Sequence, residues 1–368
     1  MNKPLLFPAE LLLQQTETIL RGWGIAADAA QQTAKLIIET DLLGIDSHGI
    51  SMLPHYDRLL RDGQWHPTGE TRLLSETPTT AVLDGGHALG HATAQRAIEL
   101  AVDKSEHSGL GCVVVRNANH FGAAGLYARY AAARGKIALV TSTTRSRMLV
   151  PSRAAVPVLG TNPIAFAAPA GRNEDFALDM ATTTVAANKI KVYDYQQKDL
   201  PAGWVVDARG DAVTSSREGM ITVYEQPEGG LTPLGGLEQN GGHKGYGLAM
   251  MAQILAGTLA GSAFAATRPP GAIPDIGHFF LAINPTAFGP LAQFQQSLDE
   301  VIDTLHATPA SDPASPVLVA GEPENHTRRQ RVEHGVPLPG SLLQKLRDIC
   351  QQRDFSDLLT PYASQSAR

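Results

Sequence analysis

The chain of 368 residues has little cysteine, few aromatic residues and no long hydrophobic run. Its two cysteines, Cys112 and Cys350, lie far apart among apolar residues and match no metal-ligand spacing, so we predict buried free thiols and no metal site. No apolar run approaches the roughly 18 residues that a membrane span requires, and residues 1–15 lack the pattern of a secretory signal. No cluster of lysine and arginine indicates nucleic-acid binding. We therefore expect a cytoplasmic protein without nucleic-acid or membrane partners.

What the sequence does contain is the composition of an ordinary globular protein. Hydrophobic residues make up 43% and charged residues 18%, with a net charge of −6. The chain is too long for one compact core, which favours two or three domains. The 35 glycines and 24 prolines indicate many tight turns.

The spacing of apolar residues predicts most elements. Helices are predicted over 8–20, 26–43, 51–62, 91–107, 122–134, 244–261, 288–307 and 339–352. Strands are predicted within 71–84 and over 111–116, 136–142 and 278–284. The helix at 244–261 is apolar on nearly all sides, so we expect it to be buried. Segments 262–275 and 308–317 are predicted as loop and linker, and 362–368 as a frayed end.

The alternation of helices and strands indicates an α/β fold. The stretch 155–184 is strand-like without intervening helices, which favours a mixed or antiparallel sheet over a doubly wound one. The glycines of the run 84–90 are not spaced as G-x-G-x-x-G, and no acidic residue ends a second strand about 20 residues later. That run is therefore predicted to be a turn that admits a helix, and not a conventional dinucleotide loop.

Two histidines are candidates for proton transfer. His48 lies on the glycine-flanked turn 44–49 after a strongly patterned helix, where a Ser47-His48 pair alone is typical of capping. His120 follows the strand at 111–116, at a strand's carboxyl end where sites often form, and the neighbouring Asn119 can cap the next helix. Because imidazole titrates near neutral pH, a pair of such residues would form a proton-handling site.

Three further segments suit anionic groups. Arg145 and Arg147 lie among small hydroxyls, which fits recognition of carboxylate or phosphate as well as a solvated basic loop. The segment 178–184 ends a strand with hydroxyls and backbone donors that suit a ribose or diphosphate. The glycines at 241–247 open a helix whose N-terminus, with Lys244, favours an anion.

Together these segments resemble the malate/L-lactate dehydrogenase family outside the Rossmann superfamily. The motifs occur in family order: GIDSHGI, NANHFGAAGLYA, LGTNPIAFAAP, LDMATT, NKI, GGHKGYGLAMM and GEPENHTRRQRVEHGVPLP. The resemblance implies a non-Rossmann fold with a mostly antiparallel sheet that binds NADH or NADPH. It also implies a helical domain built from both termini, and dimers or larger assemblies with the active site between domains.

The resemblance assigns roles residue by residue. His48 becomes the proton donor, oriented by Ser47, and His120 a second histidine that serves as acid/base in some members. The cofactor residues it implies are Leu178, Asp179, Met180, Ala181, Thr182, Thr183, Thr184, His243, Lys244, Gly321, Glu322 and Pro323.

The chain departs from the family pattern at Met52, and Lys189 indicates which branch of the family it resembles. Many members have an arginine that grips the substrate carboxylate at the position of Met52, so Arg145 or Arg147 is the candidate replacement, and we favour Arg147. The cyclic-imine reductases tend to have aspartate where this chain has Lys189, which favours the hydroxy-acid branches.

We therefore expect an NAD(P)-dependent oxidoreductase that interconverts a 2-oxo acid and an L-2-hydroxy acid. The alternatives are a cyclic imino acid reductase and an inactive sensor that binds nicotinamide or an acid. The expected domains are 1–74 with 325–368 for substrate binding and dimerisation, and 75–324 for the cofactor, with a possible subdomain at 186–235. We expect a homodimer.

Overall fold

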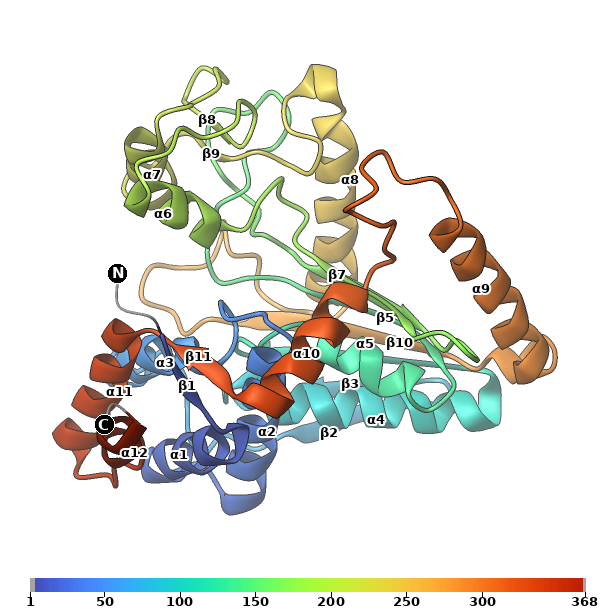
Figure 1. The fold of residues 1–368 in the computed structure, drawn as a ribbon, viewed down its shortest axis with the longest axis horizontal. Coiled ribbons are helices and arrows are strands. Elements are labelled where there is room, and N and C mark those ends of the chain that lie inside the picture. Colours follow the sequence, from blue (N-terminus) through green and yellow to red (C-terminus); the bar gives the residue numbers. More distant parts are fainter. Residues whose placement is uncertain (1–3, 367–368) are drawn as a thin grey trace.

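A computed structural model describes residues 4–366 and shows a mixed α/β protein (Figure 1). Its central sheet has seven strands in the order β2-β3-β4-β10-β5-β6-β7. These strands are β2 (Arg72–Glu76), β3 (Thr80–Asp84), β4 (Leu110–Ala118), β5 (Ile137–Ser142), β6 (Ile164–Ala168), β7 (Phe176–Met180) and β10 (Ile276–Ile283). Only β3 and β4 are parallel, and all other neighbours are antiparallel. The expectation of a mostly antiparallel sheet is confirmed.

The strand order brings several loops to one edge of the sheet. β4 and β5 both pair antiparallel with β10, so their carboxyl ends lie at the same edge. β7 also ends there, because Met180 pairs with Ile164, next to Thr141 of β5. The segments that follow these three strands contain His120, Arg145 and Thr182. Residues far apart in the sequence are thus placed along one edge.

Helices cover both faces of the sheet (Figure 1). On one face, α4 (Gly90–Ser108) and α5 (Gly125–Ala132) bury small side chains against the strands. On the other, α8 (Gly242–Ala252) continues into a π-helical turn, η3 (Gln253–Thr258), which packs through Ala256 and neighbouring Ala260. The prediction that 244–261 is buried was wrong. The opposite side of this helix exposes Met250, Ile254 and Leu259, so an all-round apolar pattern marks a helix of which only one side is covered.

A second core is built from both ends of the chain. Its elements are β1 (Leu5–Phe7), α1 (Ala9–Gly22), α2 (Ala27–Leu42), η1 (Ile50–Met52), α3 (Leu53–Arg61), β11 (Val336–Leu338), α11 (Gly340–Arg353) and α12 (Leu359–Ser366). β1 pairs antiparallel with β11, which the sequence did not predict. Residues 362–366 belong to α12, and Tyr362 packs on Phe7 with ring centroids 5.3 Å apart. The prediction of a frayed end was therefore wrong for these residues, and its remainder, 367–368, lies outside the described part of the chain.

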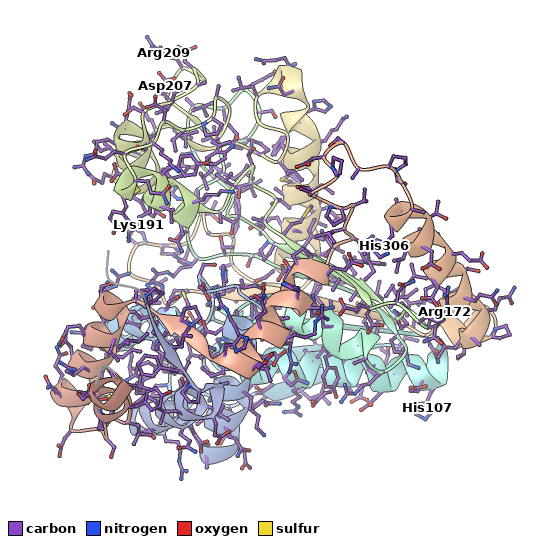
Figure 2. The ribbon with its side chains drawn as sticks, viewed as in Figure 1. His107, Arg172, Lys191, Asp207, Arg209 and His306 are labelled. Atoms are coloured by element: carbon purple, nitrogen blue, oxygen red, sulfur yellow. The ribbon has the colours of Figure 1, made fainter. Side chains whose placement is uncertain are left out.

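A small lobe stands apart from the sheet (Figure 1). It contains α6 (Ala187–Tyr195), α7 (Ser216–Tyr224) and a short pair of strands, β8 (Val205–Val206) and β9 (Gly230–Leu231), around its own apolar cluster. Figure 2 places Asp207 and Arg209 at its outer edge.

The remaining helices lie at the periphery. They are η2 (Glu238–Asn240), η4 (Pro285–Ala287), α9 (Leu291–His306) and α10 (Glu322–His334). α10 was not predicted, and it reaches α2 through an ion pair between Arg328 and Glu39. Both cysteines are free, with Cys350 buried and Cys112, contrary to expectation, only half buried. Within residues 4–366, no helix is both long and apolar enough to cross a membrane.

Candidate active site

Hydrogen bonds from groups on α2 and α10 hold the turn that carries His48. The carboxylate of Asp41, buried near the end of α2, accepts the Ile50 amide at 2.7 Å. A side chain at Gly49 would collide with that carboxylate, which explains the glycine there. Arg331 of α10 donates to the Asp41 carbonyl and pairs with Asp46. The turn is therefore held by groups from both ends of the sequence.

His48 and His120, the two predicted histidines, lie together. Their rings stack with centroids 5.4 Å apart and planes at 28°. Ser47 Oγ lies 2.8 Å from His48 Nδ1, as the prediction of an orienting hydroxyl requires. Both rings keep partial solvent exposure, yet burial lowers the pKa of each, further for His120, where nearby histidines add to it. Both side chains are therefore largely enclosed by protein but still reached by water.

His120 is held by groups that sequence patterns did not single out. The Tyr56 hydroxyl on α3 lies 2.7 Å from His120 Nδ1, and the Gly122 amide donates to the same atom at 3.3 Å. The carbonyl of His120 accepts the Gly90 amide of the glycine run 84–90 at 2.9 Å. A Cβ at Gly90 would lie 2.3 Å from the Asn119 carbonyl oxygen, so this glycine permits close approach of α4 to the His120 loop. The prediction that the run is a turn admitting a helix agrees with this packing.

Two more histidines, His278 and His91, pack around the loop that carries His120. His278 on β10 stacks on Phe121 with centroids 4.3 Å apart, and its Nε2 donates to the Asn119 carbonyl at 3.1 Å. His91 on α4 is fully buried against Tyr56 and His120, and neither of its ring nitrogens has a partner. Burial lowers the pKa of both His91 and His278 to about 3, which keeps them neutral. Within residues 4–366, no group of three or more His, Cys, Asp or Glu side chains is arranged to hold a metal ion.

The two predicted arginines line one cavity of about 610 Å³. Arg268, from the loop 262–275, is a third arginine in its wall. Arg145 is half buried and Arg147 exposed, and among the described residues neither forms an ion pair. Burial and the like charges of Arg58 and Arg268 lower the pKa of Arg145. Asp62 offsets part of this effect, and the cavity wall has more arginines than neighbouring acidic groups that act on Arg145.

His55 on α3 connects the arginine cavity with the histidines. Burial, with the charges of Arg145 and Arg58, lowers its pKa to about 4. His55 also contributes to the lowered pKa of His120, so it lies within electrostatic reach of both groups. Met52, four residues before Tyr56, packs against the core built from both termini. No lysine or arginine lies within residues 50–56 to take the role of the missing cation.

The segments predicted to hold the cofactor lie along β7, with Gly321 near its start and Thr182 beyond its end. Thr182 accepts the Leu234 amide, and Leu234 in turn packs against Gly245 near the start of α8. Gly321, at the start of α10, is packed against Ala177 of β7. Asp179 accepts the Gly125 amide at 2.7 Å, which joins β7 to the helix that follows the His120 loop. Desolvation raises the pKa of Asp179 to about 6.

The side chains in these segments differ in whether their polar groups already have hydrogen-bond or ion-pair partners within the protein. The hydroxyls of Thr182, Thr183 and Thr184 all hydrogen-bond within the protein, so they do not form the open donor stack expected from the sequence. Glu322 is similarly engaged, by His306 at 2.7 Å and the Val319 amide at 3.0 Å. In contrast, the predicted His243 and Lys244 are exposed in the first turn of α8.

These residues fit a phosphate-bearing cofactor at the N-terminus of α8. Gly241 has φ of 96°, a conformation that favours glycine, and no side chain caps the helix, although the Gly242 and Lys244 amides already donate to backbone carbonyls. Helix N-termini attract anions, and Lys244 adds positive charge. The fold and this arrangement of histidines, arginines and an exposed helix N-terminus are those of the enzyme class that the sequence motifs indicate.

Comparison with known proteins agrees with this class. A family model described as malate/L-lactate dehydrogenase matches residues 7–347, and the chain belongs to that family. It is 35% identical over 353 residues to the malate dehydrogenase of Pyrococcus horikoshii, covering 94% of each chain. It is 32% identical to the malate/(S)-sulfolactate dehydrogenase of Methanothermus fervidus, covering 91% of this chain and 94% of the relative. The crystal structure of malate dehydrogenase from Entamoeba histolytica superposes with a TM-score of 0.90 at 28% identity, covering 96% of this chain and 99% of that one.

The protein is accordingly an oxidoreductase of 2-hydroxy and 2-oxo acids that takes a nicotinamide cofactor. Neither a cyclic imino acid reductase nor an inactive sensor is better supported. Sequence reasoning missed Tyr56, His91, His278 and Arg268. Tyr56 had one usable signal, as an aromatic hydroxyl eight residues after His48 on the next predicted helix, whereas the other three become recognisable only through tertiary contacts.

Proposed function

We propose that this protein interconverts a 2-oxo acid and the corresponding L-2-hydroxy acid, with NADH or NADPH as cofactor. The observation that carries the proposal is the stacked pair His48 and His120, linked electrostatically through His55 to a cavity lined by arginines that form no ion pair among the described residues. Among the described residues, Nε2 of neither histidine has a hydrogen-bond partner, and neither atom is enclosed. Both nitrogens are therefore free to meet a substrate oxygen.

His48 is the proposed proton donor in reduction. A bound nicotinamide would supply the hydride that reduces the carbonyl carbon. As the C=O π electrons move to the oxygen, His48 delivers the proton from Nε2 and becomes neutral, while Ser47 keeps the ring oriented. In oxidation the neutral His48 takes the hydroxyl proton. Solvent restores the starting protonation state, because the ring is partly exposed.

The substrate carboxylate is proposed to bind in the arginine cavity. A buried carboxylate needs a cation, and Met52 supplies none. Arg145 is now favoured over Arg147, because it is the more enclosed of the two and its charge reaches His55. Three arginines exceed the charge of one carboxylate, which supports a substrate with a second anionic group, as in malate and sulfolactate, the acids for which the two relatives are named.

The cofactor is proposed to lie along β7. Residues 178–184 and Gly321-Glu322-Pro323 would form its walls through backbone and packing, since the threonine hydroxyls are already engaged. His243 and Lys244 would face its phosphates from the start of α8.

The decisive experiment measures the oxidation of NADH and of NADPH with a panel of 2-oxo acids and cyclic imines. Oxaloacetate and sulfopyruvate should be reduced with a higher kcat/KM than pyruvate, since each has a second anionic group for the arginines. Faster reduction of a cyclic imine would contradict the hydroxy-acid assignment. Equal kcat/KM for oxaloacetate and pyruvate would contradict the need for a second anion.

We also propose a cytoplasmic homodimer with three structural units. These are a helical domain from both termini, a sheet domain and the small lobe at 186–235, with the first boundary before β2, because that strand crosses residue 74 and joins the sheet. The two free cysteines support a reducing compartment. Light scattering at micromolar concentration tests the dimer, and a mass near the 39.1 kDa monomer would contradict it.

A further inference from the structure

The Nδ1 atoms of His48 and His120 have different kinds of partner. His48 Nδ1 faces the Ser47 hydroxyl, which can donate or accept a hydrogen bond. The same contact therefore accommodates His48 with or without a proton on Nδ1. His48 can gain and lose a proton without breaking it.

His120 Nδ1 faces a group that can only donate. The amide N–H of Gly122 points at this atom, so Nδ1 must accept and cannot carry a proton. The Tyr56 hydroxyl, 2.7 Å away, is then a second donor to the same atom. A neutral imidazole without a proton on Nδ1 carries its proton on Nε2. Protonation of Nδ1 would set one N–H against another.

The direction of the Gly122 amide is itself fixed. Tyr127 donates to the Phe121 carbonyl, which belongs to the same peptide group. Because the C=O and N–H of a trans peptide point in opposite directions, holding the oxygen aims the N–H. Gly122 has φ of 79°, and a Cβ there would lie 2.9 Å from His91 Nε2, so glycine is required at this position.

Both tyrosines remain donors at every working pH. Burial raises the pKa of Tyr56 and of Tyr127 well above the usual value, so each hydroxyl keeps its proton.

Building on the proposed function, we propose that Gly122 and Tyr56 lock His120 as the neutral Nε2–H tautomer. In this state His120 donates a hydrogen bond to the substrate oxygen, and His48 alone exchanges the proton. Tyr56 and Tyr127 are positioning residues, because they act on the reaction only through His120. A neutral imidazole used as a hydrogen-bond donor can stabilise the charge that develops on a carbonyl oxygen.

The surroundings of His120 oppose a positive charge on it. The titratable groups that face it are Tyr56 and His55 from α3, His48 from its turn, His91 from α4 and His278 from β10. None of these is an anion, so nothing around the ring favours the imidazolium form.

The first test reads the tautomer directly, in the full-length protein without substrate. Two-bond ¹H–¹⁵N spectra of protein labelled in the histidine rings report which nitrogen carries the proton, and His120→Gln identifies the His120 signals. We expect the Nε2–H tautomer for His120, unchanged between about pH 5 and 8. In Tyr56→Phe, His120 should begin to titrate at higher pH than in the wild type. An Nδ1–H tautomer in the wild type would overturn the proposal.

The second test separates hydrogen-bond donation from proton exchange. Glutamine can donate but cannot exchange a proton, so His120→Gln should keep a kcat/KM at least about tenfold above that of His120→Ala, whereas His48→Gln should be as impaired as His48→Ala. Equal loss in both His120 variants, or rescue by His48→Gln, would overturn the assignment. The matched control for Tyr56→Phe is Tyr130→Phe, which removes a tyrosine hydroxyl on α5 away from the site. If no oxo acid is reduced, the proposed function fails, while the tautomer measurement still stands or falls by itself.

Discussion

The histidine cluster and the arginine cavity are built in opposite ways. His48 and His120 are stacked, and groups from four elements hold His120 in place. Arg145 and Arg147 are partly or fully solvent-exposed and lack ion-pair partners among the described residues. Burial lowers the pKa of both histidines, and burial together with the like charges of Arg58 and Arg268 lowers the pKa of Arg145. The protein itself completes the first region, and an anionic ligand would complete the second.

This difference indicates a division of labour. Proton transfer needs fixed geometry, because small displacements of a donor lower the rate severely. Binding an anion needs charge more than rigidity, and side chains that repel one another gain stability when the anion arrives. Changes in the histidine region should therefore affect kcat, and changes in the arginine region should affect KM.

The largest expected effect comes from His48→Ala. Loss of the proposed proton donor should lower the rate of oxo-acid reduction by about 10²–10⁴-fold, while cofactor affinity stays nearly constant. Steady-state kinetics and cofactor fluorescence titration measure the two quantities. If His120→Ala is the deeper lesion and His48→Ala is mild, the roles of the two histidines are reversed.

Next in size is the loss of an arginine from the cavity. Arg145→Met should raise KM for the oxo acid about 10–100-fold with little change in KM for the cofactor, because a charge-assisted hydrogen bond is lost. Arg147→Met should act in the same direction, and lysine should restore binding only in part, since it lacks the bidentate fork. Arg209→Met, on the outer edge of the small lobe (Figure 2), is the control. Normal kinetics in both cavity variants would show that the substrate is held elsewhere.

A third prediction concerns the stability of the histidine region, where Asp41 supports the His48 turn. Burial raises the pKa of Asp41 from 3.8 to about 8, so the folded protein keeps a proton that the unfolded chain releases. Between these values the free energy of unfolding should fall with rising pH, by up to about 1.4 kcal/mol per unit from this group. Asp41→Asn removes that slope, and urea unfolding at several pH values measures it. Asp28→Asn, exposed in the first turn of the same helix, is the control, and parallel slopes for wild type and Asp41→Asn would contradict the prediction.

The smallest effect is expected at the cofactor end. Lys244→Met should raise KM for the nicotinamide cofactor about 2–5-fold, in line with an exposed charge near a helix N-terminus. KM for the oxo acid should not change, and added salt should reduce the wild-type advantage. Lys191→Met, on α6, provides a charge-matched comparison, and an equal effect there would point to general electrostatics.

Sequence patterns predicted the parts of the fold whose period is strong. The strands at 111–116, 136–142 and 278–284 correspond to β4, β5 and β10, and the helix at 91–107 to α4. In contrast, α10 has no apolar stripe and no buried residue, so periodicity could not reveal it. The pairing of β1 with β11 depends on contacts between residues over 300 apart, which no local pattern encodes.

The site divides in the same way. His48 and His120 each stand in a distinctive local motif, and the structure brings them together. His91 and His278 lie within an ordinary helix and strand, and their relevance follows only from the packing of α4 and β10 around the His120 loop. The threonines at 182–184 form an apparent ligand motif, yet their hydroxyls already donate hydrogen bonds to backbone carbonyls.

The pairing of β1 with β11 links the order of synthesis to the onset of activity. β1 is synthesised more than 300 residues before its partner β11, and Arg331, close to β11, donates to the Asp41 carbonyl beneath the His48 turn. The nascent chain can therefore assemble its sheet long before His48 is fixed in position. Contacts between residues so far apart in sequence slow folding, so we expect the contacts that hold the His48 turn to form late. A chain interrupted before residue 331 would release a folded sheet that lacks a working proton donor.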